Sequence, residues 1–258
     1  MSAVALELPG AGRALFTDRS HGNLSSVGGE QAEHGLRARE QLCEIAGAQH
    51  LIRGYQVHGT VVGRVFEDGS RPGLPSAFEP QDGARQPTFE ADGHAVAAPA
   101  VAAMVLTADC IPVVLGARGA VAALHAGWRG LAAGVLEEGV RALREVGGRG
   151  ETVAFVGPCA GLCCYEVGEE VHAAFDGVPI GDRYRNRRPT HPGTRRDRRP
   201  AGNGRSIDLR AIAHERLLAA GVTQVRDVAA CTICDERYFS HRREGARAGR
   251  QGAVAWLS

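Results

Sequence analysis

Short apolar runs, separated by polar and glycine-rich breaks, recur from one end of the chain to the other. Their short length and their richness in Val, Leu and Ala predict β-strands. Several of them follow one another directly, so we expect neighbouring strands that are connected without a helix. The runs lie at residues 3–8, 12–18, 56–66, 102–109, 111–116, 119–126, 152–157, 225–230 and 252–257.

Segments with apolar residues at helical spacing alternate with these runs and predict α-helices. The last of them is expected to begin at Ser206 or Asp208, since either side chain can cap a helix, and to end at Gly221. Neighbouring strands mixed with helices favour an α/β fold with helices packed on a mixed β-sheet, and we expect residues 1–258 to form a single domain. The helical segments are residues 28–48, 130–146, 165–175 and 206–221.

Composition and charge narrow the function classes. Of the 258 residues 44% are hydrophobic, enough for a sizeable core, and the formal net charge of +1 gives no case for a nucleic-acid or membrane partner. The chain has no lysine, which excludes Schiff-base chemistry and the lysine of a P-loop. No window approaches the roughly 18 apolar residues of a membrane span, and the N-terminus does not resemble a signal peptide. We therefore expect a cytoplasmic protein, either a monomer or a small homo-oligomer.

Positive charge is concentrated in residues 182–205, which hold nine Arg and two Asp. Pro, Gly and Asn interrupt this segment and no apolar residue anchors it, so we expect a flexible, solvated insertion. An alternative is a flap that attracts phosphate or a nucleotide to a nearby site. Residues 70–89, rich in Gly, Pro and Gln, are expected to form a loop.

Seven cysteines are an odd number, and in a chain without an export signal we expect them to be reduced. A cysteine with a function here would act as a ligand or a nucleophile. The Cys-x-x-Cys at 231–234 has no second pair at zinc-ribbon spacing, which weakens both a zinc knuckle and a redox pair as interpretations. Cys163 and Cys164 are adjacent and cannot share one face of a strand, so at least one of them is expected to be a packing residue.

Polar residues end two of the apolar runs. Asp109 and Cys110 interrupt residues 102–116, and His125 follows five apolar or small residues. Burying an unpaired polar group costs roughly 2–7 kcal/mol, so these side chains must be hydrogen-bonded, bound to a metal, or placed at strand ends that face a cleft. Each of them taken alone fits an ordinary core position, but their recurrence at successive strand ends favours a site.

The segment 127–130, Gly-Trp-Arg-Gly, adds a second feature between a strand and a helix. Its glycines allow close approach of the backbone, and the N-terminus of the following helix offers free N–H groups. Arg129 beside it is a candidate clamp for a phosphate or another oxyanion. Signatures of zincins, zinc base deaminases, dinucleotide-binding folds and α/β-hydrolases are all absent from the sequence.

Taken in order, several motifs of the chain resemble one family, the YfiH/FAMIN-like laccase-domain proteins, which are purine nucleoside phosphorylases with adenosine deaminase activity. The motifs extend from about residue 23 to residue 257, and the combination of TADC with HAGWRG is the most specific of them. They are QVHG (56–59), AD (91–92), TADCIPVVL (107–115), HAGWRG (125–130), GPC (157–159), YEVG (165–168), IDL (207–209), CT (231–232), FSHRREG (239–245) and AGR (248–250).

The resemblance implies that His58, Cys110 and His125 bind one zinc ion, with copper the less favoured metal. Three protein ligands with an open fourth position are typical of a catalytic zinc. Zinc can lower the pKa of bound water to about 7, which would serve attack on C6 of adenine. The implied substrates are phosphate and a purine nucleoside: adenosine, inosine, guanosine or S-methyl-5′-thioadenosine. The sequence does not rank them.

Phosphorolysis requires phosphate to be held against the ribose C1′ while the purine leaves. Arg129, Arg243 and Arg250 are the candidates to bind this phosphate. Asp92 and Asp109 are candidates for a general base or for orienting the histidines, and either can instead be a structural hydrogen-bonding residue. We assign Asp92, Asp109, Cys110 and Arg129 to the predicted catalytic set.

The chain departs from the family pattern at three places. His94 follows the AD motif, where small and apolar residues are usual. The alternatives for it are an extra ligand and an exposed loop residue, and we expect it to be exposed. Residues 24–41 resemble the family's entry region only loosely, and the Arg-rich segment 182–205 replaces a short connection. These departures leave the three expected metal ligands in place.

Three other functions are consistent with parts of the sequence. A cysteine hydrolase or amidase would use Cys110 as nucleophile and His125 as base without a metal. A copper polyphenol oxidase would need dense His-x-His clusters, and none of the ten histidines forms one. A metal-storing or interaction protein would show no turnover of nucleosides.

Overall fold

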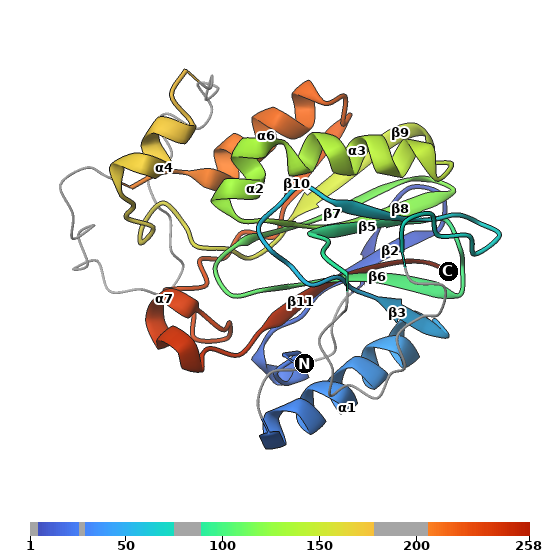
Figure 1. Ribbon diagram of the computed structural model, residues 1–258, viewed down its shortest axis with the longest axis horizontal. Coiled ribbons are helices and arrows are strands. Elements are labelled where there is room, and N and C mark those ends of the chain that lie inside the picture. Colours follow the sequence, from blue (N-terminus) through green and yellow to red (C-terminus); the bar gives the residue numbers. More distant parts are fainter. Residues whose placement is uncertain (1–4, 26–28, 75–88, 178–205) are drawn as a thin grey trace.

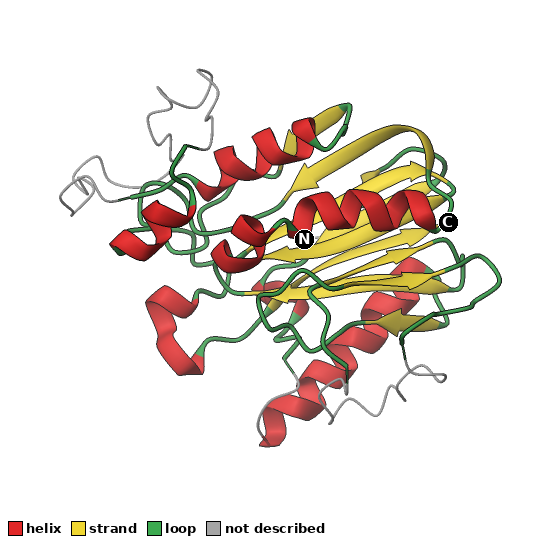
Figure 2. Cartoon of the chain, turned by 45° about the horizontal axis from the view of Figure 1, so that its top comes forward, coloured by secondary structure: helices red, strands yellow, loops and turns green. Residues whose placement is uncertain are grey.

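Two β-sheets packed face to face form the middle of the molecule, with helices on both outer sides. The computed structural model describes residues 5–25, 29–74, 89–177 and 206–258, so the Arg-rich segment and most of the expected loop at 70–89 lie outside the described residues. Figure 2 shows the strands enclosed between helices above and below. The expected α/β fold with helices on mixed sheets is confirmed.

The first sheet has five strands in the order β1-β2-β11-β6-β3. Its strands are antiparallel except for β3, which pairs in parallel with β6. Strand β11, at the end of the chain, lies between β2 and β6, so it joins the first and middle parts of the sequence. The bounds are β1 Leu6–Glu7, β2 Gly12–Phe16, β3 His50–Ile52, β6 Val101–Thr107 and β11 Gln251–Leu257.

The second sheet has six strands in the order β10-β9-β7-β8-β5-β4. Its centre is the antiparallel pair β7 and β8, and each edge is a parallel pair, β9 with β10 and β5 with β4. The sheet is therefore mixed, as the succession of apolar runs predicted. The bounds are β4 Val62–Val65, β5 Gly93–Val96, β7 Ile111–Arg118, β8 Ala120–Ala126, β9 Arg149–Val156 and β10 Gln224–Asp227.

Helices cover the outer faces of both sheets (Figure 1). Helix α1 lies against the first sheet, and α2, α3 and α6 cover the second. Helix α7 lies at the edge of the sheets where β6 ends and β7 begins. The bounds are α1 Gly29–Ala46, α2 Trp128–Ala133, α3 Val135–Glu145, α4 Glu169–Ala174, α6 Leu209–Ala219 and α7 His241–Glu244.

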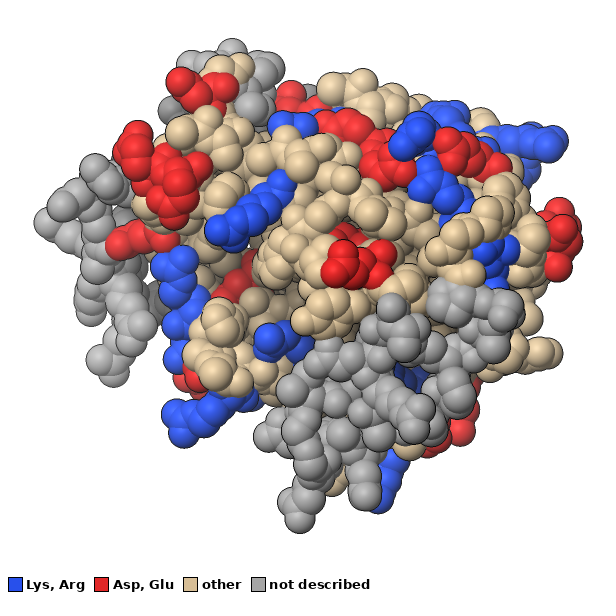
Figure 3. Space-filling view, viewed as in Figure 1, with Lys and Arg blue, Asp and Glu red and all other residues tan. Residues whose placement is uncertain are grey.

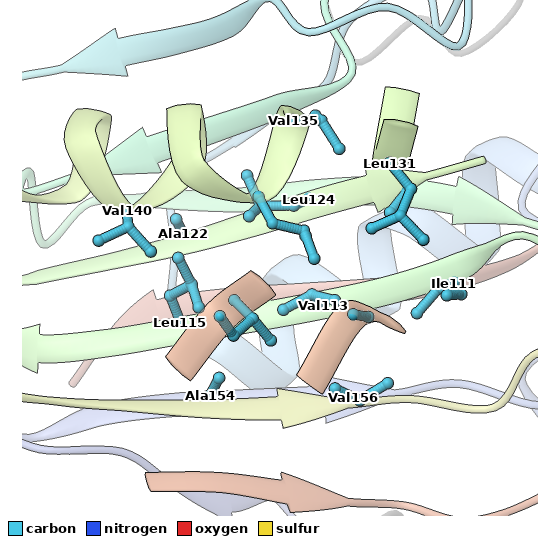
Figure 4. Packing of buried hydrophobic residues seen from close by; sticks show 14 of the residues in the cluster. Ile111, Val113, Leu115, Ala122, Leu124, Leu131, Val135, Val140, Ala154 and Val156 are labelled. Carbon is cyan, nitrogen blue, oxygen red and sulfur yellow. The ribbon is translucent and has the colours of Figure 1, made fainter. Parts of the chain in front are cut away.

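Strands β7 and β8 are buried on both faces, which explains why their sequences read as continuous apolar runs. On β8, Leu124 and Ala122 face the cluster under α2, α3 and α6, whereas Val121 and Ala123 face the first sheet. Figure 4 shows Leu124 and Leu115 packed beneath α3 with Val140. Packing on both faces holds β7 and β8 in place, and the ends of these strands carry residues of the candidate site.

Charged residues lie on the outer surface of this layer, where Figure 3 shows Arg and acidic side chains interleaved over α3. Arg64 of β4 pairs with Glu138 and Glu145 of α3. Surface pairs of this kind contribute little to the free energy of unfolding, typically 0 to about 1 kcal/mol each. No helix in the described residues has an apolar stretch long enough to cross a membrane.

Two sequence expectations about secondary structure need correction, and one open alternative, the cap of α6, is decided. The expected helix 130–146 is two helices, because Gly134 adopts a left-handed conformation with φ 99° and breaks it. The expected strand 56–66 contains only β4, and the short strand β3 was not predicted. At α6 the cap is Asp208, which accepts a hydrogen bond from the Ala211 amide.

Candidate metal centre and cleft

Three side chains from separate connections meet at one edge of the sheets. His58 lies in the connection between β3 and β4, Cys110 in the turn between β6 and β7, and His125 near the end of β8. Their ligand atoms all lie within 4.8 Å of one another, with His58 Nε2 3.6 Å from Cys110 Sγ. We call these three residues the mixed cluster. They are the three ligands that the resemblance implied.

Gln56 positions the segment that carries His58. Its amide donates to the Leu106 carbonyl at 2.7 Å and accepts from the Leu106 N–H at 2.7 Å, as a neighbouring β-strand would. This pairing joins the connection to the last residues of β6, directly before the turn that holds Cys110. The QVHG motif therefore combines an anchor with a ligand two residues later.

The glycines of HAGWRG are explained by close packing on the His58 segment. A Cβ at Gly127 would lie 2.3 Å from His58 Cδ2, and one at Gly130 would lie 2.7 Å from the Gly59 carbonyl oxygen. His58 itself has φ 61°, a left-handed conformation that is uncommon for a residue with a side chain. Strained backbone of this kind is often found at functional sites.

Asp92 orients two members of the mixed cluster from a fully buried position. One oxygen accepts from His125 Nδ1 at 2.7 Å and from the His58 amide at 3.0 Å. The other accepts from the Gly59 amide at 2.7 Å. Burial raises the pKa of Asp92, but its hydrogen bonds to His125 and to the Gly59 and Val57 amides outweigh burial and lower it. A carboxylate bound to one ring nitrogen directs the other nitrogen to a metal.

Electrostatics within the mixed cluster favour a thiolate. Burial alone would raise the pKa of Cys110, but His125 and His58 outweigh it and lower the pKa to about 6. Burial likewise disfavours protonated His125, while Cys110 and Asp92 raise its pKa to about 9. A thiolate with two imidazoles is a donor set that fits zinc with three protein ligands. The residues present therefore fit the expected ion.

Asp109 turns away from the mixed cluster. One oxygen accepts from the Thr232 hydroxyl at 2.6 Å, and the other accepts from the Arg242 amide at 2.7 Å and the Ser240 hydroxyl at 3.1 Å. Asp109 has φ 90°, so it reverses the chain just before Cys110. These contacts join the TADC turn to the turn at 231–234 and to the start of α7.

The three predicted arginines occupy different surroundings. Arg250 lines the same cleft as the mixed cluster, and its Nη1 donates to the carbonyls of Ala248 and Gly249. Arg243 donates to the carbonyls of Thr232 and Ile233 at 2.7 and 2.9 Å, so its guanidinium holds a turn. Arg129 is exposed, with its guanidinium carbon 4.2 Å from the centre of the Trp128 ring.

The cleft has a volume of about 480 Å³, within the range of about 300–1,000 Å³ that small-molecule sites occupy. Besides the mixed cluster and Arg250 it is lined by Arg53, Tyr55 and His241. Tyr55 is 46% exposed. Sequence reasoning missed these three residues, although His241 lies within the FSHRREG motif and the other two lie just before QVHG.

One sequence expectation outside the mixed cluster is wrong, and the reasoning behind another does not apply. His94 is fully buried on β5, where burial lowers its pKa to about 3. The exposure expected for it is therefore excluded. Cys163 and Cys164 lie in a turn, so the argument from strand faces does not apply to them, and both sulfurs lie close to those of Cys231 and Cys234.

Comparison with known proteins identifies the family. The sequence profile described as multi-copper polyphenol oxidoreductase laccase matches residues 11–258. The purine nucleoside phosphorylase YfiH of Escherichia coli is 32% identical over 214 residues, covering 75% of this chain and 78% of that protein. The chain belongs to the YfiH-like laccase-domain family.

Other members of the laccase-domain family agree with this assignment. A purine nucleoside phosphorylase of Xylella fastidiosa is 36% identical over 260 residues, which cover 96% of this chain and 88% of that protein. The crystal structure of protein NMB0706 of Neisseria meningitidis matches over the full length of both chains, with a TM-score of 0.74 and 28% identity. The resemblance carried by the motifs is thereby confirmed.

Proposed function

We propose that this laccase-domain protein is a zinc-dependent purine nucleoside phosphorylase that acts in the cleft beside the mixed cluster. The observation that carries the proposal is that the three potential metal ligands lie beside a cleft that is lined by cationic side chains. Phosphate and a nucleoside are the substrates that such walls and such a volume suit. The names of the relatives as purine nucleoside phosphorylases support the same reaction.

His58, Cys110 and His125 would hold the zinc ion, and Asp92 would keep His125 and the His58 backbone in place. A bound zinc ion supplies Lewis acidity and lowers the pKa of coordinated water to about 7. Asp92 has both oxygens occupied by His125 and backbone amides, so we assign it a positioning role. Asp109 is likewise held by three donors, and we assign it the same kind of role.

Phosphorolysis breaks the bond between C1′ and the purine nitrogen and forms a bond between C1′ and a phosphate oxygen. Arg250 and Arg53 line the cleft, and we propose that they bind this phosphate. The exposed ring of Tyr55 is a surface on which the purine can stack. His241, at the start of α7, is the proposed proton donor to the leaving base, because it lines the cleft and no carboxylate does so among the described residues.

Adenosine deaminase activity is the second reaction that we propose for this cleft. It replaces the amino group at C6 with oxygen from water and releases ammonia. The reaction needs no phosphate, which separates it experimentally from phosphorolysis. We propose a cytoplasmic location, since reduced cysteines are required by the mixed cluster.

A second candidate function is favoured by one specific observation. Cys110, His125 and Asp92 have the order of a nucleophile, a base and an orienting carboxylate, with 2.7 Å between Asp92 Oδ1 and His125 Nδ1. A cysteine hydrolase would use this arrangement without a metal. His58 counts against it, because a third donor 3.6 Å from the sulfur has no task in that mechanism.

The two candidates are separated by product analysis and metal analysis of the purified chain. Adenosine is incubated with and without phosphate, and the products are resolved by chromatography. Adenine formed only with phosphate supports phosphorolysis, and inosine formed in its absence supports deamination. If neither product forms, and the protein without bound zinc hydrolyses an amide substrate and loses that activity on alkylation of Cys110, the hydrolase replaces the phosphorylase.

A further inference from the structure

Four cysteines outside the cleft meet at a second point, although two sequence segments about 70 residues apart supply them. They are Cys163, Cys164, Cys231 and Cys234, and we call them the cysteine cluster. All four sulfurs lie within 4.8 Å of one another. Cys231 is buried and the other three are partly buried, and none of the four forms a disulfide.

The fold brings the two segments together through the parallel pair β9 and β10. Parallel neighbours end at the same edge of a sheet, so the turns that follow them lie side by side. An isolated bridge between Cys159 and Cys231 continues the pairing beyond both strands. The Thr232 amide donates to the Cys159 carbonyl at 3.0 Å, which fixes the second turn against the first.

The turns then direct sulfur atoms at one point. Cys163 Sγ lies 3.6 Å and Cys164 Sγ lies 2.9 Å from Cys234 Sγ. The Gly161 amide donates to Cys231 Sγ at 3.3 Å, a contact that stabilises sulfur in its thiolate form. A Cβ at Gly161 would lie 3.1 Å from Cys231 Cβ, so the absence of a side chain there allows the close approach.

We propose that the cysteine cluster binds one structural zinc ion through its four thiolates. Four sulfurs at the corners of a tetrahedron are the donor set of structural zinc sites, with Zn–S bonds of about 2.3 Å and sulfurs about 3.8 Å apart. The separations of 3.6 Å and at most 4.8 Å bracket that value, and the 2.9 Å contact is the one that the ion would widen. Binding releases the thiol protons to solvent.

The proposed ion stiffens a turn that supports the cleft. Thr232 lies between Cys231 and Cys234, and its hydroxyl donates to Asp109 next to Cys110. Arg243 binds the carbonyls of Thr232 and Ile233 from the other side. Zinc at the cysteine cluster thus acts as a clamp on the residues that position Asp109. This inference does not depend on the proposed reaction, because the ion touches no substrate.

The test is the zinc content of the full-length chain, measured by elemental analysis after purification without chelator. The wild-type chain is expected to hold about two zinc ions, and the double variant Cys231→Ser with Cys234→Ser about one. Cys43→Ser, which changes a cysteine of α1 remote from both clusters, is the matched control and keeps both. A double variant with the zinc content of the wild type overturns the proposal.

Two further measurements cover a double variant that does not fold. His58→Ala with Cys110→Ser removes the mixed cluster, and this chain is expected to retain about one zinc ion and, after exchange to cobalt, strong thiolate-to-cobalt charge-transfer absorption. If this variant holds no metal at all, the proposal for the cysteine cluster is overturned, whereas the proposal for the mixed cluster still stands. A disulfide within the cysteine cluster of freshly purified wild-type protein, or iron in place of zinc, would overturn it as well.

Discussion

The mixed cluster and the cysteine cluster are two groups of metal-ligating side chains that differ in donor number, donor type and surroundings. The mixed cluster offers two imidazoles and one sulfur and lines a cleft of about 480 Å³. The cysteine cluster offers four sulfurs, and none of its members lines that cleft. Three ligands beside a cleft leave a place for substrate or water, whereas four ligands complete a tetrahedron. This difference is the basis for proposing catalysis at the mixed cluster and a structural role for the cysteine cluster.

The two groups also differ in how their ligands are held. The mixed cluster has a buried carboxylate, Asp92, that binds one histidine and the backbone of another. The cysteine cluster relies on turn backbone, through the Gly161 amide and the bridge from Cys159 to Cys231. Because a side chain orients the mixed cluster, a single isosteric substitution should weaken its metal binding.

The largest effect is expected for Cys110→Ser. Removing the thiolate takes one of three ligands from the proposed zinc, and metal catalysis supplies several kcal/mol, so kcat/KM for adenosine phosphorolysis should fall at least about 100-fold. The zinc content should fall by about one ion per chain and that of the cysteine cluster should stay. Steady-state kinetics and elemental analysis measure both, with Cys43→Ser as control. Full activity in Cys110→Ser would reverse the assignment of the two clusters.

Asp92→Asn tests the orienting carboxylate. The amide keeps the size of the side chain but removes its charge and one acceptor, and losses of this kind typically reduce metal affinity by about 10- to 100-fold. Zinc affinity is measured by competition with a chromogenic chelator. Asp227→Asn is a matched control for the mixed cluster, because Asp227 also binds a histidine, His214, at 2.8 Å and pairs with Arg210, neither of which belongs to that cluster. Equal affinities in both variants would show that Asp92 has only a structural role.

Gly127→Ala tests the packing behind His58. The added Cβ would lie 2.3 Å from His58 Cδ2, so the imidazole must move, and we expect kcat to fall about tenfold. Gly221→Ala is the control, because its φ of 90° costs stability while nothing lies within 4 Å. Thermal unfolding and kinetics together separate the two effects. A Gly127→Ala chain that loses stability but no activity would show that His58 tolerates displacement.

The smallest effect is expected for Thr232→Val. Thr232 links the two clusters. The valine keeps the volume of the buried threonine but removes its hydrogen bond to Asp109, worth about 1 kcal/mol, so kcat should fall about fivefold or less. Zinc content should be unchanged at both clusters. Thr223→Val, which removes an equivalent bond to the Thr152 carbonyl, is the control for a general loss of stability. A change in zinc content would mean that Thr232 supports a ligand directly.

Much of the site could be predicted from the sequence because the ligands interrupt apolar runs. Cys110 directly precedes the apolar residues of β7, and His125 directly follows those of β8, so both polar residues stand out in the sequence. Arg53 and Tyr55 stand in an irregular connection without a periodic pattern, and no local signal distinguishes them. His94 was misjudged because a histidine beside a glycine resembles a loop, whereas it lies on a strand between neighbours on both sides.

The sequence by itself determined the mixed α/β class and the central apolar strands, and it marked Cys110 and His125 as polar ends of apolar runs, because burial on two faces and interrupted runs leave marks in local composition. His58 was found only through the resemblance of QVHG to the family motif. Only the tertiary structure decided which distant segments meet. The parallel pairing of β9 with β10 brings Cys163 and Cys164 to Cys231 and Cys234, and the turn of the chain at Asp109 points its carboxylate away from the cleft. These facts depend on strand order and backbone direction. Contacts between residues some 70 positions apart are set by how whole strands and helices pack, and no short stretch of sequence contains that information.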